Sequence, residues 1–219
     1  MFGVDEAGKG PVLGSMFAAA VAVEDPAVLP ADVDDSKNVA PARREEIAAR
    51  LRESDRVAVG LAEVPVARID GETDMNTLTV EAHAEAVAAV ADDDAAGIAD
   101  AGDTSERRFA RRVEDRVPAA VDLTAEHGAD ESHAVVSAAS IVAKVARDAH
   151  VADLAEAYAE EYGEAFAELG SGYPSDPTTR EFLAAFVAEH GRLPDCARRS
   201  WSTCDDVLAA AEQSGLGDF

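Results

Sequence analysis

Two apolar runs around a glycine-rich turn open the chain, and they most strongly constrain its fold. Residues 2–5 and 13–23 are rich in Val, Phe and Ala, and they flank the segment EAGKGPV. Apolar runs on either side of a glycine-containing turn are typical of two paired β-strands. We therefore expect a β-hairpin in the first 23 residues.

The rest of the pattern alternates strands and helices and then continues with helices alone. Strands are expected at 56–64, 95–100 and 118–123, and helices at 41–53, 76–90, 132–162, 178–191 and 205–211. Pro41 and Gly191 stand where a helix start and a helix stop are typical. This order predicts an α/β fold, a sheet flanked by helices, with a helical extension at about 165–212. No repeat or long linker interrupts it, so we expect one domain over 1–219.

The net charge of −25, from 44 acidic and 19 basic side chains, limits the conditions in which this chain could meet nucleic acid. Charges interact over about 10 Å at 0.1 M salt but over about 3 Å at 1 M. The acids are spread among Ala and Val instead of forming a tail, which is typical of a halophilic protein. The alternative, a partly disordered acidic chain, is disfavoured by a hydrophobic content of 47%.

The sequence shows neither a signal-peptide pattern nor a membrane-spanning run, which bears on the cellular compartment. The start MFGVDEAG has no signal-peptide pattern, and the longest apolar run, 12–23, is too short to span a bilayer. Cys196 and Cys204 have no histidine partners at metal-binding spacing, so two free thiols are expected. We expect a cytoplasmic protein without a membrane partner.

Four acids are placed to share a divalent metal ion. Neighbouring strand residues point to opposite faces, so Asp5 and Glu6 converge only if the strand ends there and the chain turns. The glycines that follow permit such a turn. Asp100 ends a predicted strand and Asp130 precedes a predicted helix, and Mg²⁺ prefers such oxygen ligands. The alternative is a tight hairpin whose acids only face water.

The segment SAASIVAK carries a second polar feature. Ser137, Ser140 and Lys144 lie at i, i+3 and i+7, on one face of a helix, and could face phosphate. The alternative is two buried serines that bond their own helix and a lysine that reaches solvent. The chain has only three lysines, and the others, Lys9 and Lys37, lie in GKG and DDSK.

Seven motifs in order resemble those of type 2 ribonucleases H (ribonuclease HII), especially archaeal ones. They are GVDEAGKGPVLG, DDSK, GIADAGD, AEHGAD, VSAASIVAKVARD, GSGYPSDP and RRSW. The resemblance covers nearly the whole chain. It implies a ribonuclease H-like mixed β-sheet flanked by helices, and a monomer.

The resemblance also implies which residues act. Asp5, Glu6, Asp100 and Asp130 match the family's four catalytic carboxylates, which bind Mg²⁺ or Mn²⁺. The segment Gly8–Gly10 matches the turn whose backbone reads the ribose 2′-OH, although Lys9 replaces the usual arginine. The other substrate contacts implied are Lys37, Ser137, Lys144 and Tyr173.

The implied activity is endonucleolytic. The family hydrolyses the phosphodiester on the 5′ side of ribonucleotides, in RNA–DNA hybrids and at single ribonucleotides in duplex DNA, by two-metal-ion catalysis. The products carry 3′-OH and 5′-phosphate ends. Two alternatives stay open, another ribonuclease H-like nuclease and a non-catalytic, clamp-bound adaptor. A type 3 ribonuclease H is disfavoured, because Asp5 leaves no room for that family's extra amino-terminal domain.

The last seven residues, QSGLGDF, contain Gln213, Leu216 and Phe219. This spacing resembles the peptide by which replication enzymes dock on the sliding clamp (PCNA). One helical turn would place Leu216 and Phe219 on one face, ready for an apolar pocket. The alternative is a frayed tail.

Overall fold

The computed structural model describes residues 1–33 and 39–216 and divides the chain into two compact units. The first unit comprises residues 1–9, 16–64 and 73–147, and the second comprises 10–15, 65–72 and 148–219. The expectation of one domain over 1–219 stays a prediction.

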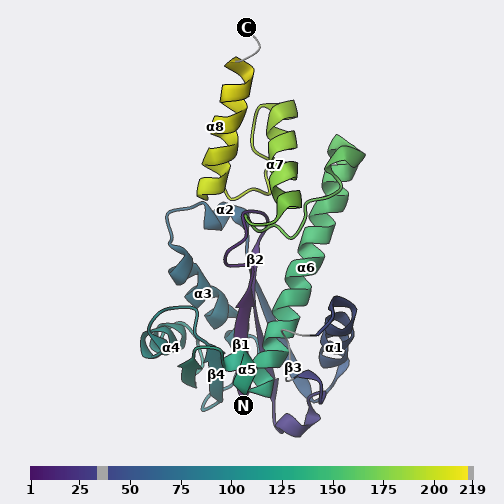
Figure 1. Ribbon diagram of the computed structural model, residues 1–219. Coiled ribbons are helices and arrows are strands. Elements are labelled where there is room, and N and C mark those ends of the chain that lie inside the picture. The colour runs from purple at the N-terminus through teal and green to yellow at the C-terminus, as the bar shows by residue number, and fades with distance from the viewer. Residues whose placement is uncertain (34–38, 217–219) are drawn as a thin grey trace. The chain divides into compact units, whose positions relative to one another are not determined.

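A mixed five-stranded sheet forms the centre of the first unit (Figure 1). Its strands lie in the order β3-β2-β1-β4-β5. β1 pairs antiparallel with β2 and parallel with β4, which pairs parallel with β5. The strands are β1 (Phe2–Ala7), β2 (Met16–Val23), β3 (Val57–Val64), β4 (Ala96–Asp100) and β5 (Asp122–Glu126). The parallel strands β1, β4 and β5 therefore all end at one edge of the sheet.

Helices cover both faces of this sheet. α1 (Pro41–Glu53) and the first half of α6 (Ala134–Tyr162) pack against alternate residues of β2, among them Ala19 and Val21. α3 (Met75–Ala88) packs against β1, β2 and β3, and α4 (Glu106–Glu114) packs against β5. The short α5 (Ala129–Ser132) lies against β4.

Two strand glycines let helices α6 and α3 approach the sheet closely. A Cβ on Gly3 would lie 2.5 Å from the Val135 carbonyl carbon in α6. A Cβ on Gly60 would lie 2.2 Å from the Ala86 oxygen in α3. These strand positions are glycine because helix backbone occupies the space of a side chain.

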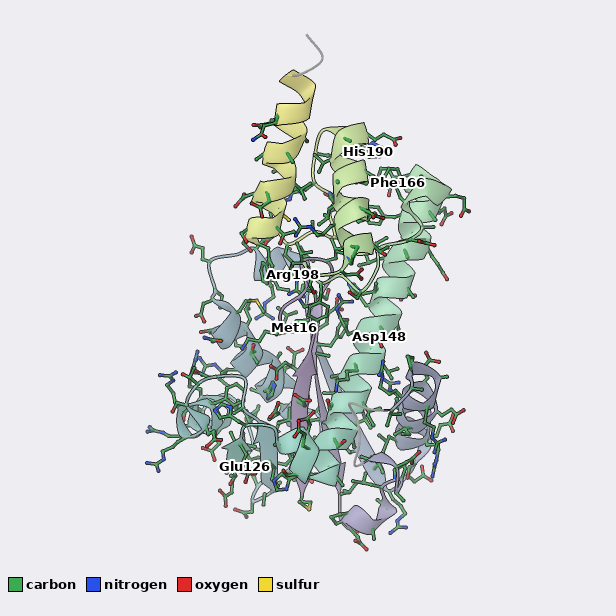
Figure 2. The ribbon with its side chains drawn as sticks, viewed as in Figure 1. Met16, Glu126, Asp148, Phe166, His190 and Arg198 are labelled. Atoms are coloured by element: carbon green, nitrogen blue, oxygen red, sulfur yellow. The ribbon has the colours of Figure 1, made fainter. Side chains whose placement is uncertain are left out.

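The second unit is helical and has its own aromatic core. It contains α2 (Val66–Ile69), the end of α6, a 3₁₀ turn (Glu164–Phe166), α7 (Pro177–His190) and α8 (Ser202–Leu216). Phe186 lies at its centre, with ring centroids 4.4 Å from His190 and 5.0 Å from Tyr162. Figure 2 labels Phe166 and His190, whose ring centroids lie 5.5 Å apart.

Most elements expected from the sequence are confirmed. α1 has the expected bounds, and Gly191 ends α7 in a left-handed conformation with φ of 66°. The strand expected at 118–123 is wrong, because β5 begins only at Asp122. The helix expected at 205–211 is longer, since α8 begins at Ser202.

Two further expectations concern the cysteines and membrane-spanning segments. Cys196 and Cys204 are buried free thiols, as expected. Among the described residues, no helix combines the length and apolar character needed to cross a membrane.

We expect Gly3→Ala to destabilise the protein by about 1–3 kcal/mol, because the added methyl group meets helix backbone that cannot move aside easily. Gly10→Ala is the matched control, since its Cβ would make an ordinary 3.6 Å contact with Tyr173. Chemical denaturation at fixed molar KCl, followed by circular dichroism, measures both variants. Equal stability of the two variants would contradict the close packing of α6 on β1.

Candidate active site

Asp5 and Glu6 stand side by side in β1 but face different helices. The expectation that the strand ends at these residues is wrong, because β1 continues to Ala7. Strand side chains alternate between faces. Asp5 therefore lies on the α6 face, next to Ser140, whereas Glu6 lies on the α3 face, against His83.

Asp5 is buried and electrostatically strained. Only 5% of its surface is exposed. Burial raises the pKa of the Asp5 carboxyl well above its usual value, and the charges of Glu6 and Asp100 raise it further. The Ser140 hydroxyl faces Asp5 and lowers this pKa, although it makes no hydrogen bond of normal geometry within the described part of the chain. The Glu6 amide donates to Asp5 Oδ1 at 2.7 Å.

Glu6 is held by cationic and hydrogen-bonding groups. Burial raises the pKa of its carboxyl, but the hydrogen bond and charge of His83, together with the charge of Lys9, outweigh burial and leave this pKa below its usual value. His83 Nε2 lies 2.7 Å from Glu6 Oε2. The imidazole is fully buried, and Phe109 packs edge-on against it at a centroid distance of 5.0 Å.

Asp100 lies beside Asp5 at the same edge of the sheet. The register pairs Val4 with Ala99, so the next residues of the two parallel strands, Asp5 and Asp100, share a face. The Ala129 amide donates to Asp100 Oδ1 at 3.0 Å. Burial raises the pKa of Asp100, and the charges of Glu6 and Asp130 act in the same direction.

Asp130 completes the cluster from α5. It lies in the first turn of that helix and is 5% exposed. The structure therefore brings the four predicted carboxylates to one end of the sheet, where the charges of neighbouring members raise the pKa values of Asp5 and Asp100.

The four carboxylates fit a divalent cation by their chemistry. Within residues 1–33 and 39–216, no three Asp, Glu, His or Cys side chains are arranged closely enough to form a finished metal site. Buried carboxylates that repel one another are nevertheless costly to ionise, and a divalent ion with oxygen preference relieves that cost.

Lys9 supports the site from the turn that follows β1. Its ammonium donates to the Gly102 carbonyl and, at 3.1 Å, to Asn76 Oδ1. Lys9 thereby links the turn to the start of α3 and to the loop after Asp100. Gly8, with φ of 88°, supplies the left-handed turn that brings the lysine there.

In the second unit, Gly10 and Tyr173 lie together. A Cβ on Gly10 would be 3.6 Å from the Tyr173 ring, and the tyrosine is 45% exposed. Trp201 Nε1 donates to the Gly10 carbonyl at 3.3 Å. The Val12 amide donates to the Gly172 carbonyl at 2.8 Å. Gly10 and the GSGYPSDP segment thus lie side by side within this unit, with Gly10 and Tyr173 exposed.

Three other residues are predicted to contact the substrate phosphates, and two of them lie in the described part of the chain. Ser137 is fully buried and its hydroxyl donates to the Val33 carbonyl, so it presents no free hydroxyl to phosphate. Lys144 is half-buried on α6. Lys37 lies outside the described residues.

The tail residues are described only in part. Gln213 is exposed on α8, and Leu216 is the last residue of that helix. Phe219 lies outside the described residues.

Sequence reasoning missed two groups near the carboxylates. His83 carried no local signal, since a histidine within an alanine-rich helix does not reveal which strand it contacts. Glu126 lies opposite Asp100 in the sheet, and its Oε2 is 2.8 Å from His133 Nε2 (Glu126 is labelled in Figure 2). Glu126 ends β5 as Asp100 ends β4, but the strand expected at 118–123 stopped before it.

Arg198 of the RRSW motif is a buried structural residue. It is fully buried, its Nε donates to the Gly14 carbonyl at 2.8 Å, and its guanidinium lies 5.1 Å from the centre of the Trp201 ring. Its role is to hold the glycine-rich segment of the second unit.

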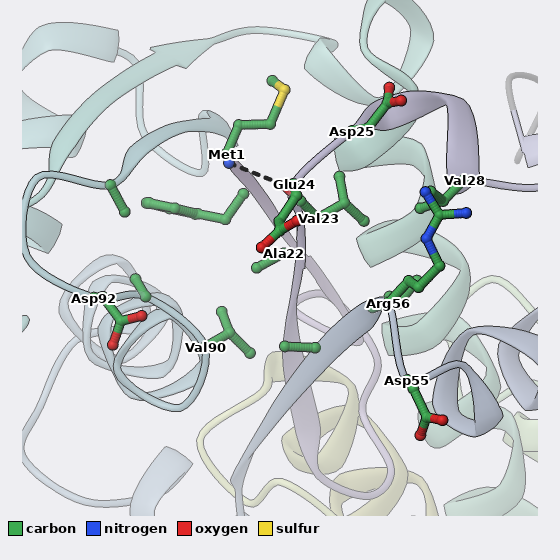
Figure 3. Close-up of a pocket in the computed structure, with 15 residues that line it drawn as sticks. Met1, Ala22, Val23, Glu24, Asp25, Val28, Asp55, Arg56, Val90 and Asp92 are labelled. Carbon is green, nitrogen blue, oxygen red and sulfur yellow. Dashed lines mark hydrogen bonds between the residues drawn. The ribbon is translucent and has the colours of Figure 1, made fainter.

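A cavity of about 470 Å³ lies at the opposite end of β1 (Figure 3). Met1 and Phe2 line it together with the end of β2, and the amino-terminal nitrogen donates to the Val23 carbonyl at 3.0 Å. Since Asp5 and Glu6 lie near the other end of β1, this cavity is separate from the candidate active site.

The mixed sheet and the acidic edge define a class, the ribonuclease H-like hydrolases. The family model described as Ribonuclease HII matches residues 2–204. The chain belongs to the ribonuclease HII family and is accordingly a ribonuclease H endonuclease, of an archaeal and halophilic kind. This confirms the resemblance found in the sequence.

Three relatives illustrate this similarity. Ribonuclease HII of Haloarcula marismortui is 66% identical over 219 residues, covering 100% of this chain and 99% of that protein. The structure of ribonuclease H2 from Pyrococcus horikoshii has a TM-score of 0.82 at 32% identity, covering 96% and 98%. The structure of a PCNA:RNase HII complex from Archaeoglobus fulgidus has a TM-score of 0.80 at 34% identity, covering 94% and 95%.

We expect His83→Leu to weaken Mn²⁺ binding by about 10- to 100-fold, because Glu6 loses the partner that orients it. His83→Gln should retain most of the affinity, since an amide nitrogen can occupy the place of Nε2. Calorimetric titration with Mn²⁺ measures affinity independently of cleavage. Wild-type affinity in the leucine variant would contradict a positioning role for His83.

Proposed function

We propose that this ribonuclease H cuts on the 5′ side of ribonucleotides, both in RNA–DNA hybrids and at single ribonucleotides within duplex DNA. The products would carry 3′-OH and 5′-phosphate ends. The observation that carries this proposal is the cluster of Asp5, Glu6, Asp100 and Asp130 at one edge of the sheet. The turn that follows two of these residues offers backbone groups to a ribose.

We infer that the four carboxylates hold Mg²⁺ or Mn²⁺. Two such ions, when bound, would activate a water and stabilise the leaving oxygen of an in-line displacement at phosphorus. The residues contribute in different ways. His83 and Lys9 keep Glu6 ionised and oriented, while the buried Asp5 and the half-buried Asp100 gain the most from a neighbouring cation.

Recognition of the ribonucleotide rests on the segment Gly8–Gly10 and on Tyr173. A 2′-OH is the group that distinguishes RNA from DNA, and backbone amides and carbonyls can bond it. The half-exposed Tyr173 ring beside Gly10 offers a flat apolar surface to a sugar. Lys9 is engaged by Gly102 and Asn76, which favours recognition by the turn's backbone over recognition by this side chain.

The first test uses a DNA duplex with one embedded ribonucleotide, with Mg²⁺ or Mn²⁺, at low and at molar KCl. We expect a single nick 5′ to the ribonucleotide at molar salt, where the repulsion between the acidic surface and the duplex is screened. Asp5→Asn should abolish the nick, because the ionised carboxylate is lost.

Circular dichroism must show that the Asp5→Asn variant is folded. We expect it to be at least as stable as the wild type without metal, since a buried charge with a raised pKa is removed. Absence of any nick by folded wild-type protein would favour the non-catalytic adaptor. A nick at another position would favour a nuclease of different specificity.

We further propose that the tail Gln213, Leu216 and Phe219 docks on the sliding clamp. The spacing of these residues and the exposure of Gln213 on the last helix support this proposal. The related ribonuclease HII that forms a complex with PCNA is a further support.

We expect a chain cut after Ala211 to be lost from pull-down with the archaeal clamp, because an apolar anchor no longer fills its pocket. The double variant Leu216→Ala/Phe219→Ala tests the side chains without shortening the helix. Nicking activity on free duplex should be unchanged in both. Equal retention of all three proteins by the clamp would reject the docking role.

A further inference from the structure

Helix α4 and the turn after it concentrate positive charge in a strongly acidic protein. Five of the sixteen arginines of the chain lie within ten residues. Four of them are exposed and one is half-buried; in order, they are Arg107, Arg108, Arg111, Arg112 and Arg116. In a chain of net charge −25, this segment is a local concentration of positive charge.

The two acids of α4 itself, Glu106 and Glu114, bond backbone amides. Glu106 Oε1 accepts the His127 amide at 2.9 Å, and Glu114 Oε1 accepts the Leu123 amide at 2.9 Å. Both carboxylates therefore bond the backbone at the ends of β5. Glu106 and the C-cap residue Asp115 are exposed, but residues 106–116 carry five arginines against three acids.

Arg107 and Arg111 form an outer cationic face. They lie at i and i+4, one turn apart on the helix. Neither makes a side-chain hydrogen bond or an ion pair with any residue in the described part of the chain. Elsewhere exposed arginines do pair with neighbouring acids, as Arg43 does with Glu46 and Arg192 with Asp195.

The inner arginines fix α4 next to the candidate active site. Arg108 donates to Asp103 at 2.7 and 3.1 Å and holds the pKa of that carboxyl at about 2. Arg112 donates to Thr77 Oγ1 at 2.7 Å, in the first turn of α3. Asp103 follows Asp100 by three residues. The cationic face therefore belongs to the same unit as the carboxylates and is anchored to the loop that follows one of them.

We propose that Arg107 and Arg111 bind the phosphate backbone of the nucleic-acid duplex away from the bond that is cut. This proposal rests on the proposed function. Guanidinium groups form bidentate hydrogen bonds with phosphate, and such short-range contacts persist when long-range attraction is screened. A protein with an acidic surface needs such a local cationic contact to hold a polyanion at all.

The test compares Arg107→Gln/Arg111→Gln with a matched control, Arg52→Gln/Arg56→Gln. The control removes two exposed arginines, also four residues apart, from another part of the first unit. Nicking is measured on a long duplex and on a short duplex limited to the base pairs around the ribonucleotide. The salt range is the one in which circular dichroism shows each protein to be folded.

For the α4 variant on the long duplex, we expect KM to rise and kcat to stay unchanged. The slope of log KM against log salt concentration should fall by about 2, since two phosphate contacts are lost. On the short duplex the variant should match the wild type. The control should match the wild type on both substrates.

Three results would overturn the inference. One is an unchanged KM and salt slope on the long duplex. Another is an equal change in the control, which would indicate net charge alone. The third is a change in sedimentation of the α4 variant, which would assign the face to the acidic surface of a second copy of this chain. Absence of nicking by the wild type would instead contradict the proposed function.

Discussion

The alternation of side chains along β1 is the constraint on which the site depends. Two consecutive carboxylates at the end of one strand must face opposite sides of the sheet. Asp5 meets α6 and Glu6 meets α3, so each face supplies a different environment. The helices above and below the sheet thus determine how each of two adjacent acids behaves.

This difference separates the two acids electrostatically. His83 and Lys9 compensate the burial of Glu6, so its charge is stabilised within the protein itself. Asp5 has only weak compensation, and its charge is opposed by burial and by two neighbouring acids. Such an imbalance is typical of sites whose charge is completed by a bound cation. The repulsion among these acids lowers the stability of the metal-free protein, as is common at functional sites.

Charge at the surface follows a related pattern. The excess of acids reflects a protein of the halophilic kind, in which salt screens repulsion. The arginines are less uniform. Some pair with nearby acids, some hold the backbone, as the buried Arg198 does, and the outer pair of α4 makes no such contact with a described residue. The location of each arginine in the fold therefore indicates its function better than the net charge of the chain does.

The sequence determined the local elements and the order of the motifs. Period and caps predicted α1 and α7, and the acid at the end of a strand predicted the place of Asp100. The strand expected at 118–123 was misplaced because the apolar residues 118–121 form the loop that precedes β5. β5 itself alternates exposed Asp122 and Thr124 with buried Leu123 and Ala125, a weaker signal by composition.

Only the tertiary structure decided which side chains meet. His83 reaches Glu6 across 77 residues of sequence, and Lys9 reaches Gly102 across 93. It also turned Ser137 inward to Val33 while Ser140, one turn later, faces Asp5. The physical reason is that periodicity fixes the face on which a residue lies. The partner on that face depends on how distant helices pack against the sheet.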